Sequence, residues 1–294
     1  MSRDLVGYGG AWPDFTWPGG VRLAVSVVVN FEEGAEQQIL DGDPVSERIG
    51  EVISVVPEGK PDPGQAQIFG YGTRAGVWRM MDALERYDIP ATIFACGRAA
   101  TRAAPVLSRL AAAGHEVANH GWIWRPHANY ESAADEAADL DRAGEALYAA
   151  SGERPVGFFC RGAESPWTRD LLAERGYLYT SNGFDDDLPY RDPSGLLVVP
   201  YALDTNDMKF FHPNGFVRAV EMVDYVRDAL DVLEDEATAG KPRLLNIGFH
   251  LRIVGRPGRF KAFAGILAEL ARRRERIWIA RRADIARAFC EDGG

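Results

Sequence analysis

The sequence predicts a single-domain α/β protein built as a (β/α) barrel. Its 294 residues, of which 46% are hydrophobic and 26% charged, are enough for one large core. The run Arg22–Asn30 is almost continuously apolar, which is typical of a strand that is buried on both faces in a parallel sheet. From Arg74 onward, strand-like and helix-like segments alternate to give about eight strands in all. We expect seven to eight strands, with some irregular or missing units.

Two segments stand outside this alternation. Residues 1–20 are rich in Gly, Pro and aromatic residues, and we expect them to form an N-terminal arm that packs its rings into grooves of the domain. Residues 33–72 contain Gly, Pro and charge without clear periodicity. A loop of this length is usually functional, so we expect a lid or an oligomer contact there.

The remaining elements follow in order. A helix with apolar residues at helical spacing begins near Arg74 and is broken by Ile89 and Pro90. Glycines such as Gly114 and Gly176 mark the ends of two later helices. After the first strand, the expected strands are 91–95, 116–117, 155–160, 177–181, 196–200, 244–249 and 277–280, and the later helices are 105–113, 132–150, 167–175, 215–236, 259–274 and 284–290.

Composition excludes several classes of partner. The net charge of −10 argues against nucleic acid, which needs a basic face. No stretch approaches 18 consecutive apolar residues, so no membrane association is expected, and the first residues lack a signal-peptide pattern, which predicts a cytoplasmic protein. Three distant cysteines (Cys96, Cys160 and Cys290) indicate neither a disulfide framework nor a structural zinc site.

Polar and charged side chains follow the predicted strands. Because the carboxyl ends of parallel strands share one rim of a barrel, we expect them to meet there. A histidine at such a strand end, as at His120 and His250, is a candidate catalytic group, although either could be structural. A lone loop carboxylate is more often a solvated turn former. The set comprises Glu32, Glu33, His120, Arg161, Glu164, Asp185–Asp187, Asp204, Asp207, His250, Arg252 and Arg256.

Several motifs resemble a known family. Asn30-Phe31-Glu32-Glu33-Gly34, the run Gly114–His120, Arg161 after the fourth strand and Ile247-Gly248-Phe249-His250 resemble the polysaccharide deacetylases, the metal-dependent amide hydrolases of carbohydrate esterase family 4. Further runs are similar to the allantoinase-like branch of that family, whose members open a small cyclic ureide ring; they are 72–79, 185–190, 203–208 and 255–257.

The sequence departs from the deacetylase pattern at the metal ligands. The family carries two adjacent aspartates, one a general base and one a ligand, and a His-x-x-x-His motif that supplies two more ligands. Here Glu32 and Glu33 stand at the aspartate positions, and Trp124 stands four residues after His120. An indole nitrogen only donates, so it cannot bind a metal. The allantoinase-like branch is similarly depleted and is regarded as needing no metal, so we expect no metal and no cofactor. A site formed by His120, Glu33 and His250 remains an alternative.

These observations predict an enzyme that hydrolyses a carbon–nitrogen bond other than a peptide bond, most simply by opening a small cyclic amide or ureide. Hydrolysis needs a base for water, a donor for the developing oxyanion and an acid for the leaving nitrogen. We assign the base to Glu33 or Glu32, since two adjacent carboxylates raise the pKa of one of them. Adjacent strand residues face opposite ways, so only one should point into the site. His120 and His250 would share the other two roles.

Four further residues are candidates for binding the small-molecule substrate. Arg161 and Arg256 would hold a carbonyl or carboxylate group, Trp124 would form an apolar wall, and Asp204 lies in one of the allantoinase-like runs. The spacing around Arg161 differs from that branch, so the ring that is cleaved stays open. The branch also implies a homo-oligomer.

Two other functions remain open. One is a metal-dependent N-deacetylase of an acetylated sugar or polysaccharide. Such an enzyme would be expected to be secreted and to carry a triad of metal ligands. The other is an inactive barrel that serves as a binding protein. Serine-type catalysis is disfavoured because no Gly-x-Ser-x-Gly elbow occurs.

Overall fold

The sheet is the frame of the molecule, and residues 4–292 are described by this computed structural model. Its nine strands follow the order β6-β7-β5-β4-β3-β2-β1-β8, with β9 paired to β1. Every pairing is parallel except β6 with β7. The strands are β1 (Leu23–Phe31), β2 (Ala91–Ala95), β3 (Glu116–Asn119), β4 (Gly157–Phe158), β5 (Tyr179–Thr180), β6 (Tyr190–Arg191), β7 (Leu197–Val198), β8 (Arg243–His250) and β9 (Trp278–Ile279). The sheet curls into a half-barrel, which confirms the predicted single-domain α/β fold of the (β/α) barrel type.

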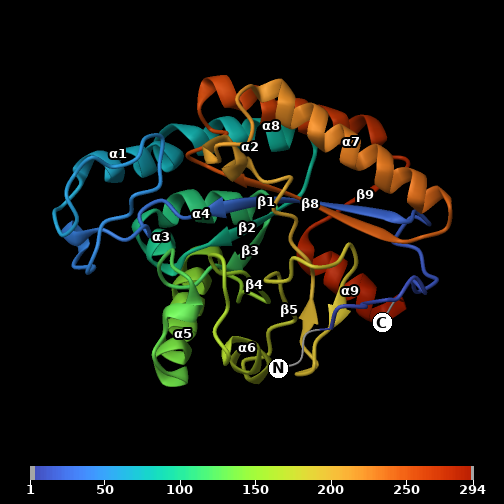
Figure 1. Cartoon of the computed structure of the whole chain (residues 1–294), viewed down its shortest axis with the longest axis horizontal. Helices are drawn as coiled ribbons and strands as arrows, with labels where there is room; N and C mark the ends of the chain where they lie inside the picture. Colours follow the sequence, from blue (N-terminus) through green and yellow to red (C-terminus); the bar gives the residue numbers. More distant parts are fainter. Residues whose placement is uncertain (1–3, 293–294) are drawn as a thin grey trace.

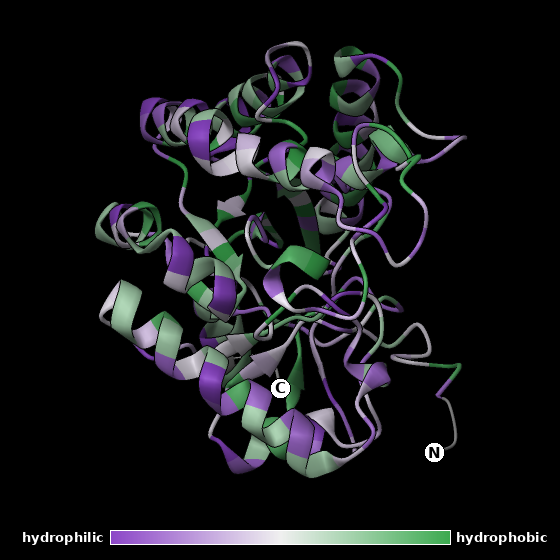
Figure 2. Cartoon of the chain, turned by 90° about the vertical axis from the view of Figure 1, so that its left-hand side faces the viewer, coloured by the Kyte–Doolittle hydropathy of each residue, from purple (hydrophilic) through white to green (hydrophobic). Residues whose placement is uncertain are grey.

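Helices surround the curled sheet. In Figure 1, α2, α7 and α8 lie together along β1 and β8, whereas α5 and α6 lie at the other end of the curled sheet, where α5 contacts β3. Purple and green residues alternate along these helices in Figure 2, as expected where one face packs on strands and the other meets water. None of the helices within residues 4–292 is long and apolar enough to cross a membrane. The helices are α1 (Pro63–Tyr71), α2 (Val77–Tyr87), α3 (Gly97–Arg102), α4 (Ala104–Ala112), α5 (Ala133–Ser151), α6 (Thr168–Glu174), α7 (Ala219–Thr238), α8 (Pro257–Arg273) and α9 (Arg282–Asp292).

The segment 33–72 is more regular than the sequence suggests. It contains α1, where the Asp62 side chain accepts from the backbone N–H of Gln65 at 3.1 Å and Pro63 occupies the first turn. A π-helical turn, Gly72–Gly76, then joins α1 to α2. The long loop expected at 33–72 therefore ends in a helix, which the sequence did not reveal because α1 has no sustained apolar stripe. Figure 1 shows α1 and its loop at one edge of the molecule.

Other differences concern short elements. The antiparallel pair β6 and β7 has two residues in each strand, too few to give an alternating pattern. Helix α3 follows β2 directly and was not predicted either. Within the strand expected at 155–160, only β4 is regular strand, although Val156 and Phe159 on either side also hydrogen-bond to the neighbouring segments at Leu178 and Asn119.

The arm closes the amino ends of the strands. Trp17 is fully buried, donates through Nε1 to the Arg243 carbonyl at 3.0 Å and stacks on Trp278 at 5.9 Å between ring centroids. Phe15 meets Phe289 of α9 edge to face at 5.6 Å. Residues 1–3 of the predicted arm lie outside the described residues.

Alternate side chains of strand β1 point into two different environments. Its odd-numbered residues belong to the large apolar layer beneath the helices: Leu23, Val25, Val27, Val29 and Phe31. Its even-numbered residues face the interior of the half-barrel: Ala24, Ser26, Val28 and Asn30. That interior is partly polar. The buried guanidinium of Arg282 donates to Ser26 Oγ at 2.9 Å and to Asn246 Oδ1 at 2.8 Å, so the lower half of the barrel is filled and only the carboxyl end is left for a site.

Candidate active site

The carboxyl ends of β1, β3 and β8 bring the site together. Asn30 of β1 is in register with His250, the last residue of β8, and His120 directly follows β3. The alternation of β1 continues past its end. Glu32 therefore points to the same interior side as Asn30, and Glu33 points to the helix side.

Glu32 lies at the centre of the site. Its Oε1 is 3.3 Å from Nε2 of His120 and 3.3 Å from Nε2 of His250. Its Oε2 accepts from Arg252 Nη1 at 2.6 Å. All four side chains are buried. One carboxylate thus gathers three nitrogen groups, with very little of any of the four side chains exposed.

These neighbours determine the charge of Glu32. Burial opposes ionisation, but Arg252 and the two histidines outweigh it and hold the pKa of Glu32 well below its usual range. The carboxylate is therefore ionised at neutral pH. The negative charge of Glu32 in turn attracts the Arg252 guanidinium. That guanidinium also lies 4.2 Å above the Phe69 ring and 4.9 Å from the Trp124 ring.

Glu33 is turned away from this group. Its oxygens accept from the backbone N–H of Arg252 at 3.1 Å and of Glu32 at 3.1 Å. A Cβ at Gly72 would lie 2.5 Å from Glu33 Oε1, so the side chain fits only because residue 72 is glycine. Burial raises the pKa of Glu33 to about 7, against the pull of Arg252. The structure therefore directs Glu32, and not Glu33, at the two histidines.

His250 is held between two carboxylates. Its Nδ1 donates to Asp207 Oδ1 at 2.6 Å, and its backbone N–H donates to Asp207 Oδ2 at 2.8 Å. Burial disfavours the charged ring, but Glu32 and Asp207 outweigh burial and raise the pKa of His250 to about 9. At neutral pH His250 is an imidazolium whose Nε2–H points at Glu32.

His120 has a different partner. Its Nδ1 donates to the carbonyl of Phe159, which can only accept, so Nδ1 carries a proton. Its ring also stacks on Phe159 at 5.3 Å. This bond fixes the orientation of the imidazole and leaves Nε2 facing Glu32.

A cavity of about 430 Å³ opens above these groups. Its floor holds Asn30, whose Nδ2 donates to Tyr201 OH at 3.2 Å, and the Tyr201 ring stacks on Phe159 at 4.4 Å. The walls are largely apolar and aromatic. They include Ile49, Trp124, Phe159, Tyr201, Leu203, Met208 and Phe211, together with Arg161, Lys209 and His212.

Arg161 and Trp124 form one wall of this cavity. The Arg161 guanidinium lies 3.7 Å above the indole and its Nη1 is 2.5 Å from Glu47 Oε2. The positive charge is therefore balanced by the loop that precedes α1, and the pair fastens that loop beside the cavity mouth.

Two predicted substrate-binding residues lie elsewhere. Asp204 accepts from the exposed Tyr225 OH at 3.0 Å and lines a neighbouring groove. Arg256 lies 3.4 Å from Glu51 and stacks on Tyr71 at 3.8 Å, and neither it nor Asp204 lines the cavity that holds Glu32. Their positions give no support to the predicted contacts with substrate.

Asp207 and Arg252 were missed as site residues, although both were noted among the polar residues after strands. Asp207 opens a 3₁₀ turn, Asp207–Phe211 (η4), that is capped by the Asn206 side chain, which accepts from Met208 N–H at 2.8 Å. The Asn206 cap distinguishes Asp207 from Asp204, and it is the feature of the sequence that could have identified Asp207. Arg252 lies two residues after His250, and an arginine in a loop at that spacing carries no signal that identifies it as a site residue.

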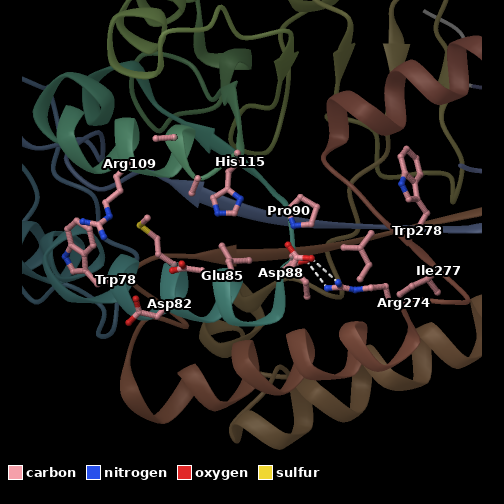
Figure 3. Close-up of a pocket in the computed structure, with 17 residues that line it drawn as sticks. Trp78, Asp82, Glu85, Asp88, Pro90, Arg109, His115, Arg274, Ile277 and Trp278 are labelled. Carbon is pink, nitrogen blue, oxygen red and sulfur yellow. Dashed lines mark hydrogen bonds and ion pairs between the residues drawn. The ribbon is translucent and has the colours of Figure 1, made fainter. Parts of the chain in front are cut away.

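A larger cavity, of about 840 Å³, lies at the opposite end of the strands. Figure 3 shows its polar groups, where Arg274 is joined to Asp88 and His115 lies near Pro90. His115 accepts from the backbone N–H of Ala91 at 3.2 Å through Nδ1, and Arg109 lies over Trp78. Arg274, Asp88, Arg109 and His115 thus already have structural partners among the described residues. The smaller cavity is therefore the candidate active site.

Comparison with known proteins shows the family to which the chain belongs. The family model described as polysaccharide deacetylase matches residues 59–179. A protein of Schizosaccharomyces pombe, assigned by name to the polysaccharide deacetylases, is 32% identical over 98% of this chain and 97% of its own length. This chain belongs to the polysaccharide deacetylase family. It is accordingly a hydrolase of that family.

Solved structures agree with this assignment. A Pseudomonas aeruginosa PAO1 protein assigned to the polysaccharide deacetylases superposes with a TM-score of 0.93 at 39% identity, covering 99% of this chain and 98% of that one. The structure named Puue allantoinase superposes with a TM-score of 0.92 at 41% identity, with the same coverage of both chains. The predicted resemblance to the polysaccharide deacetylase family is thus confirmed, and an allantoinase is among the similar structures.

The metal of the polysaccharide deacetylases does not fit the residues present. Within residues 4–292, no group of three or more His, Cys, Asp or Glu side chains is arranged to hold a metal ion. Glu33 is turned away from His120 and His250, so the alternative ligand set of these three is not assembled. The Arg252 guanidinium occupies Oε2 of Glu32 at 2.6 Å, where it would repel a dication, and Trp124 stands where the family carries a histidine ligand.

Proposed function

We propose that this chain opens the ring of a small cyclic amide or ureide by hydrolysing a C–N bond, without a metal. The observation that carries the proposal is the position of Glu32, whose carboxylate lies between two imidazoles and a guanidinium at the floor of the cavity. These groups supply a base and two nitrogen donors in the absence of a Lewis acid.

The cavity suits a small ring. Its volume of about 430 Å³ lies in the range of small-molecule sites, and its aromatic walls can pack on both faces of a flat ring. A glycan chain would need an open groove lined with hydroxyl-binding groups. Here the Arg161–Glu47 ion pair lies beside the mouth, with Arg161 over Trp124, instead. These features favour a ring over an acetylated polymer.

Glu32 acts as the base in this mechanism. Its ionised carboxylate takes a proton from water as the water oxygen bonds to the carbonyl carbon. The carbonyl oxygen then carries the negative charge of a tetrahedral intermediate. When the intermediate collapses, the C–N bond breaks, the ring nitrogen receives a proton and the carbonyl carbon becomes a carboxylate.

His250 supplies positive charge to this sequence. Asp207 holds its Nδ1 and keeps the ring protonated, so Nε2–H can donate to the developing oxyanion and then deliver a proton to the leaving nitrogen. His120, oriented by the Phe159 carbonyl, presents Nε2 on the other side of Glu32 and guides the water. Asn30 Oδ1 is buried without a hydrogen-bond partner among the described residues, so it can accept an N–H of the ring.

The proposal is tested by a turnover panel on the purified chain. It contains allantoin, hydantoin, a cyclic imide and N-acetylglucosamine oligomers, with products identified by mass. We expect ring opening, seen as a gain of one water, and no release of acetate. Acetate release alone would replace the proposal by sugar deacetylation, and no turnover of any substrate would favour a binding protein.

A further inference from the structure

The charged groups of the candidate active site are almost all paired. Glu32 faces Arg252 at 2.6 Å, His250 faces Asp207 at 2.6 Å, and Arg161 faces Glu47 at 2.5 Å. Each of these pairs cancels much of its own field in the cavity. Any charge that remains must therefore come from another residue.

That residue is Lys209. It lines the cavity that holds Glu32, and within residues 4–292 its ammonium group has neither an ion pair within 4.0 Å nor a side-chain hydrogen bond. Glu32 is the only acid that lines the cavity among the described residues, and Arg252 already offsets it. The mouth thus carries one uncompensated positive charge in a chain of net charge −10.

We propose that Lys209 binds an anionic group of the substrate, so that the site takes a cyclic amide or ureide that carries a carboxylate. This inference rests on the function proposed above and narrows its substrate class. Lys209 is a half-buried residue at the cavity, and a substrate carboxylate would give its ammonium a charge-assisted hydrogen bond.

The backbone around Lys209 is fixed, as a specificity residue requires. Lys209 lies two residues after Asp207 on η4, and its carbonyl accepts from the backbone N–H of Phe216 at 3.1 Å. A Cβ at Gly215 would lie 1.7 Å from that carbonyl oxygen, so the loop closes tightly on the turn. Since Asp207 holds His250, one short turn carries both the anchor of the reacting end and the cation at the mouth.

Arg161 is less suited to this role. Its guanidinium is already bound to Glu47 and lies flat on Trp124 at 3.7 Å. Binding a substrate carboxylate there would require breaking the ion pair. Lys209 has no such bond to break.

The test compares two probes that differ in one carboxylate, hydantoin and hydantoin-5-acetate, on the full chain. Lys209→Met should lower kcat/KM for hydantoin-5-acetate by about 10- to 100-fold, mainly through KM, which is the range expected for a lost hydrogen bond between charged groups. The fall for hydantoin should be smaller, and Lys209→Arg should restore most of the preference. Lys261→Met, at an exposed position on α8, is the matched control and should leave both substrates unchanged.

Calorimetric measurement of the affinity for the same two probes distinguishes a failure of this inference from a failure of the proposed function. If the chain binds hydantoin-5-acetate more tightly than hydantoin, and Lys209→Met removes the difference, the inference holds even without turnover, while the proposed hydrolysis fails. Equal affinity for both probes in the unaltered chain, or a preference that survives Lys209→Met, would overturn the inference even if both rings are opened.

Discussion

Arg252 donates to Oε2 of Glu32 at 2.6 Å, and the other oxygen of the same carboxylate lies 3.3 Å from each of two histidines. The guanidinium is fully buried, and its charge, together with the two histidines, lowers the pKa of the buried Glu32 so that it stays ionised. A permanent cation of the chain therefore occupies the carboxylate that a metal would need.

Glu32→Gln should abolish most of the activity. Removing the base should lower kcat by about 100-fold or more, the usual contribution of general base catalysis. Glu33→Gln is the matched comparison, because that side chain accepts from two backbone N–H groups, lies 3.7 Å from Arg252 Nη1 and does not line the cavity, so its loss should reduce kcat far less. Initial rates on a ring substrate, with folding checked by circular dichroism, would decide between them; a larger loss in the Glu33 variant would reverse the assignment.

Asp207→Asn should change the alkaline limb of the pH–rate profile. The pKa of His250 is raised to about 9, so its proton is present at neutral pH and is lost as the pH rises through about 9. Without the Asp207 charge that pKa falls, and kcat/KM should decline at a lower pH than in the unaltered chain. An alkaline limb that does not move would show that protonated His250 is not required.

Arg252→Met should change the acidic limb. Loss of the guanidinium removes the strongest force that lowers the pKa of Glu32, so activity should appear only at higher pH. Methionine keeps an apolar stem against Phe69 and Trp124. A thermal melt shows whether the variant folds, and in a folded variant an unchanged acidic limb would contradict the role of Arg252.

Glu33→Gln should also alter how stability depends on pH. The folded-state pKa of Glu33, about 7, lies above its usual 4.5. Ionisation of Glu33 therefore lowers the free energy of unfolding as the pH rises from 4.5 to 7. The glutamine variant avoids this cost. Its free energy of unfolding relative to the unaltered chain should therefore rise by up to roughly 3 kcal/mol between pH 4.5 and 8. Urea titrations at both pH values measure the difference, and a constant offset would count against the raised pKa.

The sequence was sufficient for the fold because strand periodicity and helix ends are local signals. The apolar run of β1 predicted a strand buried on both faces, and β1 indeed lies inside the sheet between β2 and β8. Elements such as β6 and α1 were missed because two-residue pairing and a helix without an apolar stripe leave no period to detect.

The candidate site was only partly predictable. His120, His250 and Glu32 could be named from strand ends and motifs, but the choice between Glu32 and Glu33 needed the direction of β1. The small or polar residues Ser26 and Asn30 carry that information, since they share the parity of Glu32. The pairing of Asp207 with His250 spans 43 residues, and no local pattern reports such a contact.

The central claim is that the residues of this chain perform ring hydrolysis without a metal. It is tested most directly by measuring the rate of ring opening by protein treated with a strong chelator and shown by elemental analysis to be free of transition metals. The account predicts that the rate is unchanged by chelation and is not increased by added zinc or cobalt. Loss of activity on chelation, restored by adding back one metal, would contradict it.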